Sequence, residues 1–179
     1  MPQNQIKQLA IVSGKGGTGK TTIAAAFASL ATDKVLVDCD VDAADLHLLL
    51  HPRVLKQEKY FGGRSPRVDL DNCTKCGLCT EVCRFDAIES GVVDYVSCEG
   101  CGFCSHICPE NAIAMEEAFS GDWFVSDTPY GPFVHARLGI GEENSGKLVT
   151  VVRKQAMEIA NEKGLRLILI DGPPGIGCP

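Results

Sequence analysis

Three short apolar runs along the chain are each long enough for a buried strand, and helical patterns stand between them. Strands that alternate with helices are typical of a doubly wound, mostly parallel sheet, so the expected fold class is α/β. The expected strands contain residues 9–12, 34–38 and 165–170, and the expected helices cover 20–31 and a segment from Asn144 or Ser145, as N-cap, to Gly164.

Composition narrows the class of protein and its partners. The chain has 179 residues, 45% of them hydrophobic and 22% charged, which is enough for one core and a small second one. The formal net charge is -6 and no long Lys/Arg run is present, so no nucleic-acid partner is expected. No apolar run approaches the roughly 20 residues of a spanning helix, and the polar opening is unlike a signal peptide. The expected location is therefore cytoplasmic, away from any membrane.

A glycine-rich loop follows the first predicted strand. Residues 14–21, Gly-Lys-Gly-Gly-Thr-Gly-Lys-Thr, match the phosphate-binding pattern G-x-x-x-x-G-K-[ST] at every position. The alternative is an accidental match in a glycine-rich turn, but a strand before it and a helix after it favour a phosphate site. Lys20 is expected to reach the terminal phosphates of ATP, and the Thr21 hydroxyl to ligate magnesium. The expected nucleotide contacts in the loop are Gly14, Lys15, Gly16, Gly17, Thr18, Gly19, Lys20, Thr21 and Thr22.

Acidic residues end the other two predicted strands, at the edge of the sheet where open α/β folds bind ligands. Asp38 and Asp40 share a face by strand alternation, whereas Cys39 points the other way and is expected to be a buried core residue. Asp171 ends the third run in a Walker B pattern, where it can hold magnesium through water. The acids expected only to cap or flank the next helix are Asp42 and Asp45.

Eight of the ten cysteines form two copies of one repeat, in which Cys73 corresponds to Cys98 and Cys83 to Cys108. In a cytoplasmic chain they favour metal or redox chemistry over disulfides. Each copy reads C-x2-C-x2-C-x3-C, the spacing of bacterial ferredoxins, in which three thiolates ligate one [4Fe-4S] cluster and the fourth serves the other cluster. Zinc is the alternative, although it favours two separated C-x2-C pairs. The two predicted ligand sets are Cys73, Cys76, Cys79 and Cys108 for one cluster, and Cys98, Cys101, Cys104 and Cys83 for the other.

The cysteine repeat interrupts the α/β pattern. Residues 1–62 and 118–179 are assigned to a P-loop nucleotide domain, and 63–117 to an inserted α+β domain like a bacterial ferredoxin. The stretches YFGGRSP and FSGDWFVSDTPYG, rich in Gly, Pro and Ser, are expected to be the connectors. Only three parallel core strands are predicted, so the sequence is interpreted as the amino-terminal part of a longer protein.

The loop and the ordered acids resemble the MinD, ParA, Mrp and nitrogenase-iron-protein superfamily, whose deviant Walker A loop carries an early lysine. With the cysteine repeat, nearly the whole chain resembles the ATPases of this superfamily that contain an inserted ferredoxin domain. The resemblance implies that Lys15 crosses an ATP-sandwiched dimer to the partner's phosphates; a solvated loop lysine is the alternative. It further implies that Asp40 orients the attacking water, that Asp38 lies on the magnesium side, and that the Gly175 main chain senses the terminal phosphate. The implied partner is a second copy or a paralogue.

Cys178 stands seven residues after Asp171, as does a cysteine that ligates the subunit-bridging cluster in the nitrogenase iron protein. The second ligand of that protein follows a G-x-G turn; here the comparable turn is 139–141, and Glu142 follows it. One thiol per subunit does not complete a bridging cubane. A transient or carboxylate-assisted bridging site and a packed thiol both stay open.

The function predicted from these features is a slow, partner-stimulated ATPase that couples its nucleotide state to electron transfer. Its expected cofactors are ATP, magnesium and two [4Fe-4S] clusters, and its expected partner, besides the dimer mate, is a redox or cluster-accepting protein. One alternative is an ATP-dependent carrier of iron-sulfur clusters, as among Mrp-like relatives, and another is a positioning ATPase with structural clusters. Two clusters with four cysteine ligands each favour electron transfer, because a carrier needs labile, incompletely ligated clusters. The expected catalytic residues are Lys15, Lys20 and Asp40.

Overall fold

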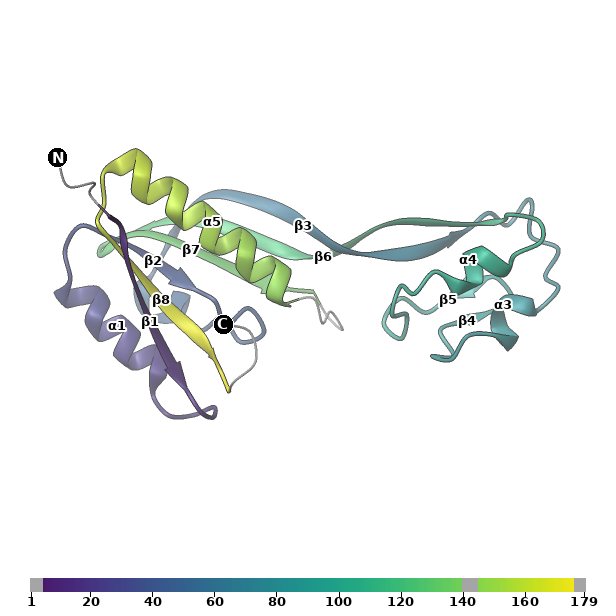
Figure 1. The fold of residues 1–179 in the computed structure, drawn as a ribbon, viewed down its shortest axis with the longest axis horizontal. Helices are drawn as coiled ribbons and strands as arrows, with labels where there is room; N and C mark the ends of the chain where they lie inside the picture. Colours follow the sequence, from purple (N-terminus) through teal and green to yellow (C-terminus); the bar gives the residue numbers. More distant parts are fainter. Residues whose placement is uncertain (1–4, 140–144, 176–179) are drawn as a thin grey trace. The chain divides into compact units, whose positions relative to one another are not determined.

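A computed structural model describes residues 5–139 and 145–175, with only the main chain of Ser145 (Figure 1). The chain divides into two compact units. Among the described residues, the first unit contains 5–60, 121–138 and 145–175, and the second contains 61–120 and Gly139. The boundaries expected from the sequence, after residues 62 and 117, lie inside strands β3 (Arg53–Val68) and β6 (Ile113–Thr128), which run from one unit into the other.

A mostly parallel sheet forms the first unit. Strands β1, β8, β2 and β7 are mutually parallel neighbours, β6 is antiparallel to β7, and β3 lies at the edge, in the order β1-β8-β2-β7-β6-β3. The central strand β2 is buried at every position, as expected for a strand covered on both faces. The remaining bounds are β1 Lys7–Ser13, β2 Lys34–Asp38, β7 Gly131–Leu138 and β8 Leu167–Pro174.

Helices cover both faces of this sheet. On one face, α1 (Lys20–Leu30) and α2 (Leu46–Leu50) pack on Leu36, Phe133 and Leu169. On the other, α5 (Ser145–Lys163) packs on a second cluster that includes Val35, Val37 and Cys39. Alternate residues of β2 therefore belong to opposite cores, which makes the first unit a three-layer α/β/α structure. The position of Cys39, 3% exposed, confirms the prediction that it is a core residue.

Two features of the strands differ from what the sequence pattern indicates. Strand β7 is a fourth parallel strand that the sequence pattern does not reveal, because polar His135 and Arg137 interrupt its apolar residues. The glycine-, proline- and serine-rich connectors lie in long strands, β3 and β6, that run from one unit into the other, although their composition is typical of loops. Pro66 is tolerated there because β3 is an edge strand. Gly121 is required where β6 passes β7, since a Cβ on it would lie 2.4 Å from the Arg137 carbonyl oxygen.

The second unit contains two short helices and a small hairpin. Helix α3 spans Leu78–Glu81, helix α4 spans Phe103–Ile107, and strand β4 (Ile88–Glu89) pairs antiparallel with β5 (Val92–Val93). Both helices begin after a glycine with a left-handed backbone, Gly77 at φ 83° and Gly102 at φ 77°, and these glycines occupy equivalent positions in the two copies. The repeat in the sequence is therefore also a repeat in local structure.

Candidate functional site

The glycine-rich loop lies between β1 and α1 and opens the start of the helix to an anion. Gly17 and Gly19 have φ angles of 73° and 82°, which only glycine adopts readily. Gly19 is the N-cap of α1 and no side chain caps the helix, whose first turn also lacks an acidic residue. The first main-chain N–H groups of α1 are thus left for a ligand, as at a phosphate-binding helix terminus.

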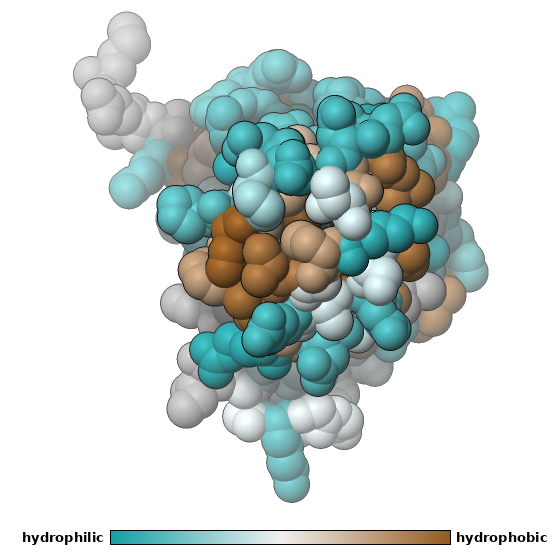
Figure 2. Space-filling model, turned by 90° about the vertical axis from the view of Figure 1, so that its right-hand side faces the viewer, coloured by the Kyte–Doolittle hydropathy of each residue, from teal (hydrophilic) through white to brown (hydrophobic). Residues whose placement is uncertain are grey.

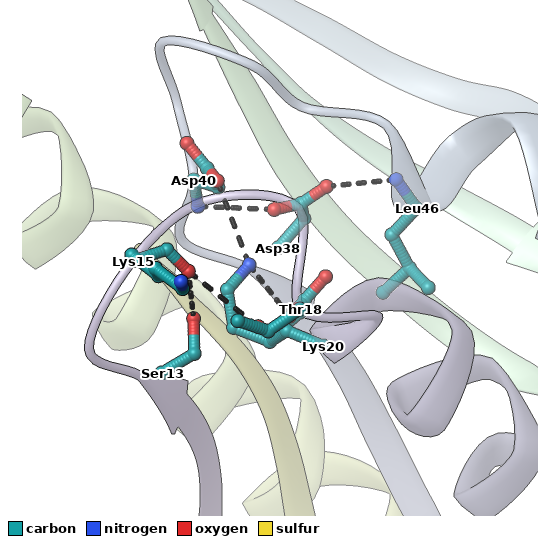
Figure 3. A network of polar contacts seen from close by, with 8 residues as sticks. Ser13, Lys15, Thr18, Lys20, Asp38, Asp40 and Leu46 are labelled. Carbon is teal, nitrogen blue, oxygen red and sulfur yellow. Dashed lines mark hydrogen bonds and ion pairs between the residues drawn. The ribbon is translucent and has the colours of Figure 1, made fainter. Parts of the chain in front are cut away.

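The side chain of Lys20 forms ion pairs with two carboxylates, and Figure 3 shows the one with Asp40. Its ammonium nitrogen lies 3.6 Å from Oδ2 of Asp40 and 3.3 Å from Oδ1 of Asp171. Lys20 is 9% exposed and Asp171 is 1% exposed. The sequence-predicted phosphate lysine and two of the predicted acids therefore meet at the carboxyl ends of β2 and β8.

Asp171 is a buried acid whose partner is the Lys20 ammonium, held as an ion pair. Burial raises the pKa of its carboxyl, while the side chains of Thr21 and Lys20 act in the opposite direction. Within residues 5–139 and 145–175, neither carboxylate oxygen of Asp171 has a donor in hydrogen-bonding geometry. Carboxylate oxygens beside a threonine hydroxyl are a donor set that magnesium prefers, so these residues fit a Mg²⁺ ion.

Asp38 is fully buried and joins the end of β2 to the start of α2. Its two carboxylate oxygens accept hydrogen bonds from the main-chain N–H groups of Asp40, at 3.0 Å, and of Leu46, at 3.1 Å (Figure 3). Burial raises the pKa of Asp38 to about 7 against the pull of these two donors, and the charge of Asp171 raises it further. Asp45 occupies the N-cap of α2 but makes no side-chain cap, so Asp38 takes the capping role expected of Asp45.

Ser13 links the glycine-rich loop to the end of β8, and the sequence analysis did not identify it. Its hydroxyl donates to the Lys15 carbonyl at 2.9 Å, and its own carbonyl accepts the Gly175 N–H at 2.8 Å. Thr18 also donates to the Lys15 carbonyl, at 3.5 Å. The Lys15 side chain itself is exposed to solvent, as is Thr22. The only signal in the sequence is a serine directly before the loop, which carries no specific information.

The sheet, the loop and the three acids define a P-loop-type nucleotide-binding fold. The family model of the CobQ/CobB/MinD/ParA nucleotide binding domain matches residues 9–170, and the chain belongs to this family. It is also 36% identical over 180 residues to an uncharacterized protein of Methanocaldococcus jannaschii. That match covers 97% of this chain but 62% of the relative, so the chain spans less than two thirds of the relative's length.

Two hollows in the second unit are each lined by four cysteines. The first hollow, which is partly open, is lined by Cys73, Cys76, Cys79 and Cys108. The second hollow is lined by Cys83, Cys98, Cys101 and Cys104. The described cysteines are all free thiols. Across the described part of the chain, however, no three His, Cys, Asp or Glu side chains form a group that could hold a metal ion.

Main-chain hydrogen bonds link the two cysteine repeats crosswise. The Asp69 N–H, at the start of the first copy, donates to the carbonyl of Ala112, which follows the last cysteine of the second copy. The Asp94 N–H donates to the carbonyl of Ala87, which follows the last cysteine of the first. Both distances are 2.8 Å. The fourth cysteine of each copy therefore lines the hollow formed by the other copy.

Two thiols of the second hollow, those of Cys83 and Cys104, have distinct surroundings. The Ala87 N–H donates to the sulfur of Cys83 at 3.4 Å. Burial raises the pKa of the Cys104 thiol, and the nearby Cys98 and Cys101 raise it further. The Cys39 thiol lies apart from both hollows, and burial raises its pKa to about 12, so it stays protonated and unreactive.

Several expected residues lie outside the described ranges. Cys178, Glu142 and most of the 139–141 turn belong to that group, so the bridging-site hypothesis stays a prediction. Asn144 is likewise not described. Helix α5 ends at Lys163, before Gly164, which has φ 65° and ends the helix as expected.

No helix within the described residues is long and apolar enough to cross a membrane.

Proposed function

We propose that this chain is an ATPase whose nucleotide state is coupled to electron transfer through two [4Fe-4S] clusters in its second unit. The observation that carries the proposal is the pair of four-cysteine hollows, joined through β3 and β6 to a nucleotide domain of the MinD/ParA family. The chain supplies one nucleotide site, and a second copy or a paralogue faces it, with Lys15 reaching the partner's phosphates.

The nucleotide site works by exchange of partners at Lys20. Its ammonium group leaves Asp40 and Asp171 to bind the terminal phosphates, because a phosphate offers it more charge-assisted hydrogen bonds. Asp40, released from Lys20, orients the attacking water. Thr21 and Asp171 would hold magnesium, with Asp38 on the same side, and the bound ion would supply positive charge to the phosphates.

Gly175 takes part in the same exchange. Its N–H donates to the Ser13 carbonyl, so it must leave that carbonyl to bind a terminal phosphate. Its left-handed backbone, at φ 87°, suits a residue that changes hydrogen-bond partner, since glycine tolerates this region at low cost. ATP and ADP therefore favour different positions for the end of β8, and this segment is the nucleotide sensor.

The thiol hollows suit a cluster better than a single ion. Zinc favours two separated C-x2-C pairs, whereas each copy of the repeat is a continuous C-x2-C-x2-C-x3-C run. That run is the spacing of bacterial ferredoxins, and each hollow is lined by four cysteines, the number that one cubane needs.

Anaerobic redox titration of the purified protein, followed by electron paramagnetic resonance, tests the proposal. We expect iron and sulfide equivalent to two cubanes per chain, and signals whose potential or line shape moves when Mg-ATP is added. Two cubanes that ignore Mg-ATP would reject the coupling and favour structural clusters. Clusters lost to an acceptor during turnover would favour a carrier, and zinc in place of iron would reject both.

The crosswise ligand sets have their own test. Cys108→Ser is expected to damage the first cluster and Cys83→Ser the second, each with loss of about half of the iron. Cys39→Ser is the matched control, because its thiol is buried in the nucleotide domain. If Cys108→Ser instead damages the cluster held by Cys98, Cys101 and Cys104, the copies do not exchange their fourth ligands.

A further inference from the structure

The negative charge of the chain is concentrated in the second unit. Residues 61–120 contain four Lys/Arg and ten Asp/Glu, which gives a net charge of -6, and the whole chain also has a net charge of -6. The rest of the chain is therefore neutral on balance. The unit that carries the thiol hollows is therefore negative, and its field can attract a positively charged partner before contact.

Exposed apolar side chains lie at the first hollow. Leu70, Leu78 and Val92 are 62%, 37% and 70% exposed, although leucine and valine normally avoid water. A Cβ on Gly91 would lie 3.4 Å from the Cys73 sulfur and 3.5 Å from Cδ2 of Leu70, so these residues are neighbours. Leu78 lines the hollow itself. We call Leu70, Leu78 and Val92 the apolar patch.

Three acidic residues lie next to the apolar patch in the chain. Asp69 and Asp71 flank Leu70, Glu89 precedes the Ser90-Gly91 turn, and all three are exposed. The first hollow is also lined by Glu110 and by one exposed cation, Lys75. The N–H of Ser90 donates to the Thr80 hydroxyl at 3.1 Å, which brings the α3 helix against that turn. Figure 2 shows hydrophobic residues exposed among hydrophilic ones on this side of the protein.

We propose that the apolar patch with its acidic rim is the docking face for a redox protein that carries an apolar centre and a rim of Lys and Arg. The negative charge of the second unit determines which class of partner can bind this face. The second unit of another copy carries the same charge of -6, and nucleic acids and anionic membranes are also negative, so this acidic face repels all three. A basic rim is attracted, and the apolar contact then excludes water next to the Cys73 hollow.

Electron transfer at this face moves one electron from a cluster to one acceptor in the partner. A reduced cluster in the first hollow loses one electron and returns to its oxidised state, and the partner's cofactor gains that electron. No atom is transferred. This inference rests on the proposed function, because it needs a cluster in the hollow, but the docking step itself does not.

The test uses ferric cytochrome c, a basic haem protein, as the probe of the face. The full chain is reduced with dithionite, excess reductant is removed, and the rate of haem reduction is followed by stopped flow at low and high salt. Asp71→Lys is expected to slow the reaction about fivefold at low salt and little at high salt. Leu70→Ser is expected to slow it at both.

Two control variants match these changes elsewhere on the chain. Glu162→Lys makes the same charge change on the exposed surface of α5, and Leu55→Ser removes an apolar side chain that is 57% exposed in β3. If Asp71→Lys reduces cytochrome c at the same rate as Glu162→Lys, or Leu70→Ser at the same rate as Leu55→Ser, the proposed docking face is rejected. Iron content and resonance spectra of each variant show whether its clusters are intact.

Binding of cytochrome c measured by calorimetry separates this inference from the proposed function. A wild-type protein without clusters rejects electron transfer, yet about fivefold weaker binding of Asp71→Lys relative to Glu162→Lys would still support the docking face. A protein with intact clusters and equal affinities for both variants rejects the face alone.

Discussion

The ammonium nitrogen of Lys20 lies 3.3 Å from a carboxylate oxygen of Asp171, and both side chains are almost fully buried. Lys20→Ala should lower ATP affinity about 10- to 100-fold, since a hydrogen bond to a charged group contributes about 1.5–3 kcal/mol. It should also lower the free energy of unfolding by about 3 kcal/mol, because it leaves a buried carboxylate without its cation. Calorimetry with ATP and urea denaturation measure the two effects.

Asp171→Asn added to Lys20→Ala is the check on this explanation. A neutral amide carries no buried charge, so part of the lost stability should return. Lys7→Ala, at an exposed position of β1, is the matched lysine control. If the double variant is no more stable than Lys20→Ala, the Lys20 ammonium does not act through Asp171.

Lys15 is predicted to act only in the dimer. Its side chain is exposed, so Lys15→Ala should change the free energy of unfolding by less than about 0.5 kcal/mol. ATP-dependent dimerisation, measured by analytical ultracentrifugation, should be lost. A Lys15→Ala protein that dimerises normally with ATP would show that this residue is an ordinary solvated loop lysine.

Gly100 is predicted to be essential for the second hollow. Its φ is 63°, and a Cβ on it would lie 2.1 Å from the Arg64 carbonyl oxygen, so Gly100→Ala must shift the main chain. The left-handed backbone alone costs a residue with a side chain about 1–2 kcal/mol. We expect Gly100→Ala to lose about half of the bound iron, measured by metal analysis.

The equivalent position in the first copy provides the control for Gly100. Lys75 occupies that position and already has φ 54° with a full side chain. Lys75→Gly should keep both clusters, because it relieves a left-handed residue without any clash. Equal iron loss in the two variants would mean that the contact with Arg64 is not the reason for glycine at residue 100.

His135 should make a destabilising contribution to the first unit in mild acid. Its ring stacks on those of Phe124 and Phe133, and burial, the charge of His47 and that of Arg137 lower its pKa to about 4. Between pH 6.5 and pH 4 the unfolded His135 binds a proton that the folded His135 does not. Its contribution to the free energy of unfolding therefore drops by about 3 kcal/mol as pH falls through this window, whereas Asp38, whose pKa is raised to about 7, acts in the opposite direction.

His135→Phe is expected to remove this contribution while keeping the aromatic stack, so the variant should lose less stability than the wild-type protein as pH falls from 6.5 to 4. His51→Asn is the control, since His51 is exposed and has φ 48°, which asparagine tolerates. Trp123, the single tryptophan, is buried in the first unit, so its fluorescence during urea unfolding reports on that unit. An unchanged slope in His135→Phe would assign the acid sensitivity to other groups.

Local spacing determined much of the nucleotide domain. The glycine loop, the helix after it and the acids at the ends of β2 and β8 are all encoded within short segments, because loop turns and strand ends depend on neighbouring residues. The same holds for the cysteine repeat, whose two copies are visible without any long-range contact. Membership of the MinD/ParA family agrees with the nucleotide domain predicted from the glycine loop and the acids.

Tertiary contacts decided the rest. Strands β3, β6 and β7 depend on cross-strand pairing with distant residues, which outweighed the glycines, prolines and polar residues in them. Asp38 reaches the N–H of Leu46, and Gly175 reaches the carbonyl of Ser13, only after the sheet has formed. These bonds join residues from separate elements, so no periodicity along the chain can reveal them.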